Sequence, residues 1–131
     1  MKLTKWFLNF DFGGRARRAH YWANLGSWLL VFMVIFGVVA GGARQDEAAT
    51  AGVGLLGVVA VVAMLLAAID GMAMVFRRAH DTGRSGWIWL LLLIPLLNLL
   101  PLYWLMIEDS HQGPNKYGPP VKAFYQAPAA A

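Results

Sequence analysis

Three long apolar runs restrict what this chain can fold into. They cover residues 22–41, 52–76 and 87–107, and the first of them contains no charged residue. About twenty helical residues, rising 1.5 Å each, cross a hydrocarbon core of about 30 Å. The sequence therefore predicts an all-α membrane protein with three transmembrane helices. The apolar content of 59% supports this class because it exceeds the usual globular share.

Length and composition exclude several other classes. A chain of 131 residues forms one domain, here residues 1–131, and its lack of cysteine excludes disulfides and thiolate chemistry. The three histidines, His20, His80 and His111, have no metal-ligand spacing, so we predict no metal and no cofactor. The net charge of +4 comes from basic residues that flank apolar runs. This pattern favours anionic lipid headgroups over nucleic acid as the partner.

The N-terminal residues 2–12 carry an amphipathic pattern. Leu3, Trp6, Phe7 and Phe10 follow the spacing i, i+3, i+4, i+7, and Lys2 and Lys5 lie elsewhere. Aromatic residues opposite a basic face are typical of a short helix lying in the membrane interface. An ordinary helix packed on the rest of the protein is the alternative. Gly13 and Gly14 end the helix in either case.

The first apolar run has a rival interpretation as a cleaved signal peptide, because a basic start precedes it and small residues occupy its end at 40–43. The run is longer than the usual 7–15 apolar residues of such a signal, which favours a transmembrane helix. Gly37 and Gly41 form a small-xxx-small pair for close helix packing, or else a loose helix end. Residues 42–51 are a short polar loop.

The second apolar run contains one charged residue, Asp70, and a stripe of small residues at Ala63, Ala67 and Gly71. An unpaired charge within a membrane costs about 3 kcal/mol on insertion scales, so we expect Asp70 to be paired or protonated. The expected partner is an arginine or a polar group from another helix, and Asn98 is the strongly polar candidate inside the third run. The alternative is that Asp70 snorkels to the cytoplasmic interface.

The third run is interrupted by Pro95, Asn98 and Pro101. We predict one span kinked by Pro95, since 21 residues suit one crossing, and a re-entrant hairpin is the alternative. Tryptophans near the ends of the runs are the expected interface anchors. They are Trp6, Trp22, Trp87 and Trp104. Residues 108–131 form a polar tail whose last residues we expect to be disordered.

Charge is segregated along the chain. Basic residues concentrate before the first run and in the 77–86 loop, whereas loop 42–51 has a net charge of −1 and the tail a net charge of zero. The positive-inside rule places the N-terminus and the 77–86 loop in the cytoplasm of a bacterium. With three spans, the tail lies in the periplasm.

The 77–86 loop and the entry to the first run supply most of the candidate site. We interpret these residues as a lipid- or anion-binding cluster or as a structural polar cluster: Arg15, Arg18, Arg77, Arg78, His80, Asp81, Arg84 and Ser85. Lipid attraction accounts for the arginines. Asp81 needs an internal donor, from a neighbouring arginine or the turn backbone, and Ser85 is placed to cap the third helix.

Enzyme chemistry has little support. His80 and Asp81 are adjacent and therefore do not face one another on a helix, and no serine or cysteine completes a catalytic arrangement. We predict no catalytic residue and no enzyme activity. Residues 82–86 at a helix start suit a headgroup phosphate, but they lack the lysine of a nucleotide-binding loop.

Three motifs together resemble a known family. They are Phe12-Gly13-Gly14-Arg15-Ala16-Arg17-Arg18-Ala19-His20-Tyr21-Trp22, the stretch Arg77-Arg78-Ala79-His80-Asp81-Thr82-Gly83-Arg84-Ser85-Gly86-Trp87, and Asn115-Lys116-Tyr117-Gly118-Pro119. In this order they resemble the small bacterial inner-membrane proteins of domain of unknown function 805. The resemblance implies a multi-spanning inner-membrane protein without an assigned activity.

These observations favour a non-enzymatic integral inner-membrane protein whose arginine-rich cytoplasmic rim binds anionic lipid or a partner. The small-residue faces predict a homo-oligomer. A small channel or transporter is the alternative, because Asp70 and the interrupted third run are typical of helices that line a pathway.

Overall fold

The computed structural model describes residues 7–42 and 48–126. Its elements are the helices α1 (Arg18–Gly42), α2 (Ala48–Asp81) and α3 (Leu99–Met106) and the 3-10 helices η2 (Gly86–Leu93) and η3 (Ala123–Tyr125). The described residues contain helices and no strand, which confirms the predicted all-α class.

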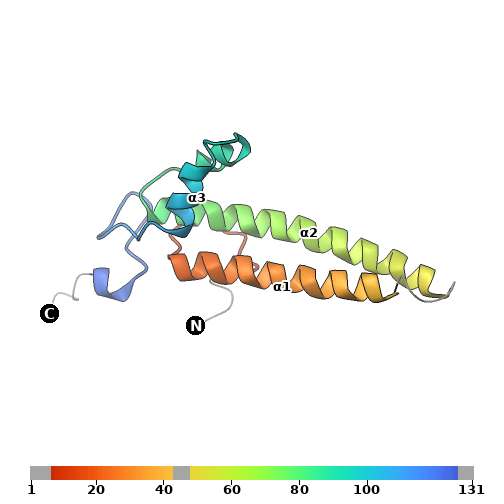
Figure 1. The fold of residues 1–131 in the computed structure, drawn as a ribbon. Helices are drawn as coiled ribbons and strands as arrows, with labels where there is room; N and C mark the ends of the chain where they lie inside the picture. The colour runs from red at the N-terminus through yellow and green to blue at the C-terminus, as the bar shows by residue number, and fades with distance from the viewer. Residues whose placement is uncertain (1–6, 43–47, 127–131) are drawn as a thin grey trace.

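Helices α1 and α2 lie side by side and antiparallel, and the other elements gather at one end of this pair (Figure 1). Two segments are long and apolar enough to cross a membrane, Arg18–Gly41 and Gly54–Asp81, with mean hydropathies of 2.1 and 2.4. They correspond to the first two predicted spans.

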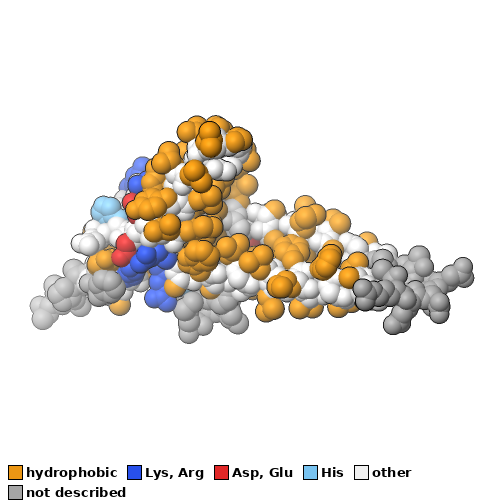
Figure 2. All heavy atoms as spheres, in the orientation of Figure 1, with side chains coloured by type: hydrophobic (Ala, Val, Ile, Leu, Met, Phe, Trp, Pro, Cys, Tyr) orange, Lys and Arg blue, Asp and Glu red, His pale blue; other side chains and the backbone are white. Residues whose placement is uncertain are grey.

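The helix pair is apolar outside and polar inside. Large apolar side chains of α1 point outward, with Met33 73% and Phe36 74% exposed, whereas Asn24, Asp70 and Arg78 are buried. Figure 2 shows apolar side chains along the helices and charged ones gathered at one end. A soluble protein buries its apolar residues, so this reversal is expected for helices that face lipid.

The predicted third span is not confirmed. Residues 86–106 form a hairpin in which η2 and α3 are joined by a turn at 94–98, and Pro95 lies in that turn instead of kinking a helix. Leu96 adopts a left-handed φ of 69° there. Pro101 falls in the first turn of α3, where a missing N–H breaks no helical hydrogen bond. Two prolines six residues apart are therefore tolerated because the run divides into two helices.

The hairpin returns the chain to its starting end. Arg78 Nε, near the end of α2, donates to the carbonyl of Leu105 at 2.9 Å, and the backbone N–H of His111 donates to the carbonyl of Asp81 at 2.8 Å. The tail therefore begins beside the 77–86 loop. This contradicts the sequence-based expectation that the tail leaves at the opposite end of the helices.

The predicted N-terminal helix is also not observed over residues 7–12. Residues 2–6 lie outside the described residues, and residues 7–12 are not helical. The backbone N–H groups of Leu8 and Asn9 donate to Asp70 instead of forming a helical turn, and Leu8 has a φ of 50°. We call residues 7–16 the N-terminal strap.

Candidate functional site

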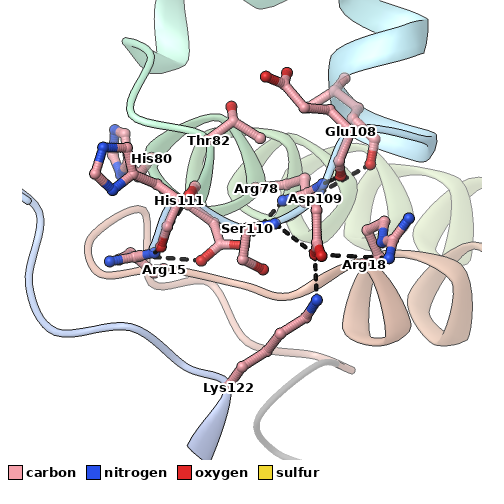
Figure 3. A network of polar contacts seen from close by, with 12 residues as sticks. Arg15, Arg18, Arg78, His80, Thr82, Glu108, Asp109, Ser110, His111 and Lys122 are labelled. Carbon is pink, nitrogen blue, oxygen red and sulfur yellow. Dashed lines mark hydrogen bonds and ion pairs between the residues drawn. The ribbon is translucent and has the colours of Figure 1, made fainter. Parts of the chain in front are cut away.

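The three sequence motifs meet at one end of the helix pair in a cluster that we call the polar cap, centred on Arg15, Arg78 and Asp81. Figure 3 shows Arg15 and Arg78 in this cluster. Arg15 Nε lies 3.0 Å from Asp81 Oδ1, and Arg78 Nη1 lies 2.9 Å from Asp81 Oδ2. The side chains of Arg78 and Asp81 are fully buried. They share a face of α2 because they are three residues apart. One carboxylate thus bridges two guanidinium groups.

Backbone carbonyls satisfy the remaining donors of both arginines. Arg15 Nη1 donates to the carbonyl of Gly113 at 2.8 Å, and its Nη2 donates to that of His111 at 2.7 Å. Arg78 Nη2 donates to the carbonyl of Glu108. All these acceptors belong to the tail. The structure therefore supports the structural interpretation of Arg15 and Arg78, since their donors are used within the chain.

The tail motif packs on His80. The rings of His80 and Tyr117 stack at a centroid distance of 3.7 Å with an interplanar angle of 11°. His80 Nδ1 lies 3.1 Å from the carbonyl of Gly14, and Asn115 Nδ2 donates to the carbonyl of His80 at 2.9 Å. His80 thus links the strap, α2 and the tail.

Only residues 82–85 of the predicted 77–86 loop lie outside a helix, because α2 ends at Asp81 and η2 begins at Gly86, and these residues position the hairpin. Arg84 forms an ion pair with Glu108, and its guanidinium carbon lies 4.4 Å from the centre of the Trp104 ring. The Ser85 side chain accepts from the backbone N–H of Trp87 and caps η2, although we expected it to cap a long transmembrane helix.

The expected interface anchors differ in their surroundings. Trp87 is 65% exposed, and Trp22 is 50% exposed while its Nε1 donates to the carbonyl of Met106 at 3.2 Å. Trp104 lies beneath Arg84. Trp6 lies outside the described residues.

Asp70 is fully buried between α1, α2 and the strap. It accepts hydrogen bonds from Trp28 Nε1 at 2.8 Å, Asn24 Nδ2 at 2.7 Å, and the backbone N–H groups of Asn9 at 2.8 Å and Leu8 at 3.2 Å. Asp70 therefore has partners within the protein, which is the paired state of the two that the sequence predicted, paired or protonated.

None of these four hydrogen bonds to Asp70 comes from Asn98. It stands at the start of α3, in the turn of the hairpin. Asn98 was therefore the wrong candidate, because the third run does not pass alongside α1 and α2 as a full span, whereas the expected polar group from another helix is present as Asn24 of α1.

Arg77 also binds the N-terminal strap. Its Nη2 donates to the carbonyl of Asn9 at 3.1 Å, and its own carbonyl accepts from the backbone N–H of Ala16 at 2.9 Å. The ring of Phe12 packs edge-on against Phe76, with centroids 5.4 Å apart. Arg77 is buried and is therefore directed at the protein rather than at headgroups.

Beside the polar cap, at the start of α1, lies a cavity of about 490 Å³ that we call the basic pocket. Its lining includes Arg17, Arg18 and Lys122. Arg18 Nη2 lies 3.6 Å from Asp109 Oδ1, and Lys122 also contacts Asp109, as Figure 3 shows. Chiefly because Lys122 donates to it, the pKa of Asp109 is lowered from 3.8 to about 2. Arg18 and Lys122 therefore share one ionised carboxylate, and Arg17 adds a third positive charge to the lining.

Several residues of these sites were not predicted from the sequence. Asn24 and Trp28 lie four residues apart and hence on one face of α1, so a polar side chain inside the first apolar run was an available signal. The roles of Arg17, Asp109 and Lys122 depend on the return of the tail, which the sequence indicated only through the alternative of a re-entrant hairpin at Pro95.

No metal site is evident in the described part of the chain, where no three His, Cys, Asp or Glu side chains are grouped to hold an ion.

Known proteins are similar to this chain over nearly its whole length. Inner membrane protein YhaH of Escherichia coli (strain K12) is 32% identical over 122 residues, which cover 93% of this chain and 94% of the relative. Inner membrane protein YhaI of the same strain is 28% identical over 125 residues, covering 87% and 92% of the two chains. No solved structure matches. The family model described as Protein of unknown function (DUF805) matches residues 9–119, and the chain therefore belongs to this family.

Proposed function

We propose that this chain is a non-enzymatic integral protein of the bacterial inner membrane that binds anionic phospholipid through the basic pocket. In this proposal α1 and α2 are the two membrane spans, and the polar cap, the basic pocket and the tail lie on the cytoplasmic side. The observation that carries the proposal is the grouping of Arg17, Arg18 and Lys122 where the apolar surface of α1 begins.

The exposed apolar side chains of α1 and α2 support membrane insertion, and two relatives are named inner membrane proteins. The concentration of Lys and Arg in residues 1–18 and 77–86 supports a cytoplasmic cap. With two spans, the tail stays on the same side as the N-terminus.

The geometry of the basic pocket suits a lipid phosphate. Guanidinium groups bind phosphate oxygens through paired N–H donors, and Arg18 begins a helix whose N-terminus favours an anion. Asp109 is one carboxylate against three cations, so the named side chains keep a net positive charge. Arg15 and Arg78 are excluded from this role because their donors are used inside the polar cap.

The main observation that favoured a channel or transporter was the charged residue Asp70 within an apolar run. Asp70 accepts four hydrogen bonds from the strap and α1, which accounts for its burial without a transported ion.

Native mass spectrometry of the purified protein tests lipid binding. The protein is reconstituted with phosphatidylglycerol, cardiolipin or phosphatidylcholine, and the copies of each lipid retained are counted. We expect retention of the two anionic lipids. Each basic residue near a headgroup contributes about 1 kcal/mol, so Arg17→Gln and Lys122→Gln should each weaken retention about fivefold.

The matched control is Lys116→Gln, which removes one charge from an exposed residue of the tail that does not line the pocket. It should retain lipid as the parent protein does. Equal loss in all three variants, or equal retention of phosphatidylcholine, would contradict the proposal. The same spectra test the homo-oligomer, which predicts multiples of the 14.4 kDa chain.

Topology is tested separately with single cysteines, because the chain has none of its own. We expect an impermeant maleimide added to intact spheroplasts to label Gln45→Cys and to spare Thr82→Cys and Ala131→Cys. Labelling of residue 131 from outside would restore the three-span arrangement.

A further inference from the structure

The hairpin of residues 86–106 presents an apolar surface that the polar cap does not explain. Exposed apolar side chains occur on both arms and at the tip. They include Trp87, Leu93, Leu96, Leu99 and Tyr103, and Leu96 at the tip is 83% exposed. No charged residue occurs between Arg84 and Glu108, and Asn98 is the only side-chain amide in this stretch.

We infer that this apolar hairpin inserts into the acyl region of one leaflet only, the leaflet next to the polar cap, as a wedge beside the two spans. The inference rests on the proposed insertion of α1 and α2 and goes beyond it. Its partner is the lipid monolayer itself.

The length of the hairpin limits how deep it reaches. Eight residues of η2 rise about 16 Å at 2.0 Å each, and eight residues of α3 rise about 12 Å at 1.5 Å each. The hydrocarbon core is about 30 Å thick. Each arm is therefore about half as long as the core is thick, which sets an upper limit on its depth because the hairpin projects to one side of the α1–α2 pair (Figure 1). Its two ends are held at the polar cap by Arg78 and Arg84.

Part of the backbone of the turn suits an apolar environment, although the N–H groups of Leu96 and Leu97 at the tip donate to no backbone carbonyl of the described residues. In lipid, each unpaired backbone N–H is costly. Inside the hairpin, the N–H groups of Ile94, Asn98, Leu99 and Leu100 donate to carbonyls of Leu91, Ile94, Leu96 and Leu97. Pro95 has no N–H to satisfy.

The distribution of exposed side chains favours lipid over a second copy of the chain. On η2 the exposed side chains Trp87, Leu90 and Leu93 lie three residues apart and therefore on one face of the 3-10 helix, and Leu96 and Leu97 are exposed at the tip. This apolar surface continues along the exposed apolar side chains of α1 and α2 (Figure 2). Acyl chains cover the hairpin and the proposed spans together, whereas a second copy docked on the hairpin stripe alone would leave the faces of the spans uncovered.

The foot of the hairpin carries the residues expected at headgroup depth. Trp104 lies under the Arg84 guanidinium, and exposed Trp87 follows the capping residue Ser85. Aromatic rings with a polar edge prefer this level of a membrane. The hairpin is thus apolar at its tip and amphipathic at its base.

Spin-label depth measurements test the inference in nanodiscs of phosphatidylglycerol and phosphatidylcholine. Leu96→Cys reports the tip, Leu30→Cys the middle of α1, and Thr82→Cys the polar cap. We expect the label at 96 to show high collision with oxygen and low collision with an aqueous nickel chelate, at a depth between the other two.

Each other outcome overturns the inference in a distinct way. High nickel collision at 96 would place the hairpin in water. A short distance between labels at 96 in different chains would show a second copy covering it. A depth equal to that of Leu30 would show that the tip reaches the bilayer centre.

The label at Leu30 and the lipid-retention spectra test the proposed function without reference to the hairpin. If Leu30 is in lipid and anionic lipid is retained while Leu96 is in water, only the hairpin inference fails. Far-ultraviolet circular dichroism and the melting temperature of each labelled protein confirm that the fold is kept.

Discussion

Asp81 Oδ1 lies 3.0 Å from Nε of Arg15, a residue 66 positions earlier in the chain, and both side chains are almost completely buried. This contact, with its counterpart from Arg78, joins the entry of α1 to the end of α2. A buried carboxylate between two guanidinium groups is costly to break, because removing it leaves two charges without a counter-ion.

We therefore expect Asp81→Asn to destabilise the protein by about 3–5 kcal/mol, the range for breaking a buried ion pair. Thermal unfolding in detergent measures the loss. Asp109→Asn is the control, since it removes the same charge from a side chain that is 46% exposed and should melt close to the parent. Equal melting temperatures for Asp81→Asn and the parent would show that the ion pairs do not hold the cap together.

Asp70→Leu should release the N-terminal strap. The substitution removes the acceptor for the backbone N–H groups of Leu8 and Asn9 and for two side chains of α1, and each unpaired buried donor costs about 1–3 kcal/mol. Maleimide labelling of Leu8→Cys should become faster in Asp70→Leu. Asp70→Asn keeps one acceptor oxygen and should show an intermediate rate. An unchanged rate in both variants would refute the role of Asp70 as the anchor of the strap.

Gly86→Ala should disturb the docking of the hairpin on α2. A Cβ at Gly86 would lie 2.1 Å from Cδ1 of Phe76, which is too close for any real contact. Overpacking of this kind costs about 1–3 kcal/mol, and Phe76→Leu in the same chain should recover part of the loss.

Gly71→Ala is the matched control within α2, because a Cβ there meets nothing within 4 Å. It should be neutral or stabilising, since alanine favours a helix over glycine. Melting temperatures of the single and double variants decide the matter. Equal effects at residues 71 and 86 would rule out a packing cause.

The Asp109 carboxylate should titrate abnormally low. Its pKa is lowered to about 2, chiefly because Lys122 donates to it. The carboxylate therefore stays ionised below its ordinary pKa of 3.8, and its contact with Lys122 is lost as the pH falls through about 2. Lys122→Gln should raise this pKa toward 3.8. Carbon-13 nuclear magnetic resonance of labelled aspartate in neutral detergent measures it. A similar rise in Lys116→Gln would point to a general charge effect instead.

Local properties of the sequence determined the class of this protein. The apolar runs at 22–41 and 52–76 predicted the two long helices, because length and hydrophobicity are properties of consecutive residues. The motifs around Arg15, Arg78 and Asn115 indicated the family before any contact was known. The need of Asp81 and Asp70 for internal donors also followed from the sequence, since a buried carboxylate requires them.

Only the tertiary structure decided which groups meet. The run at 87–107 is apolar enough for a span, and its division at Pro95 depends on the packing of η2 and α3 on α2. The donors of Asp70 lie 42 to 62 residues away, and the carbonyls that hold Arg15 come from a tail about a hundred residues later. Such pairings arise when chain segments are brought together in space, so composition and spacing carry no local trace of them.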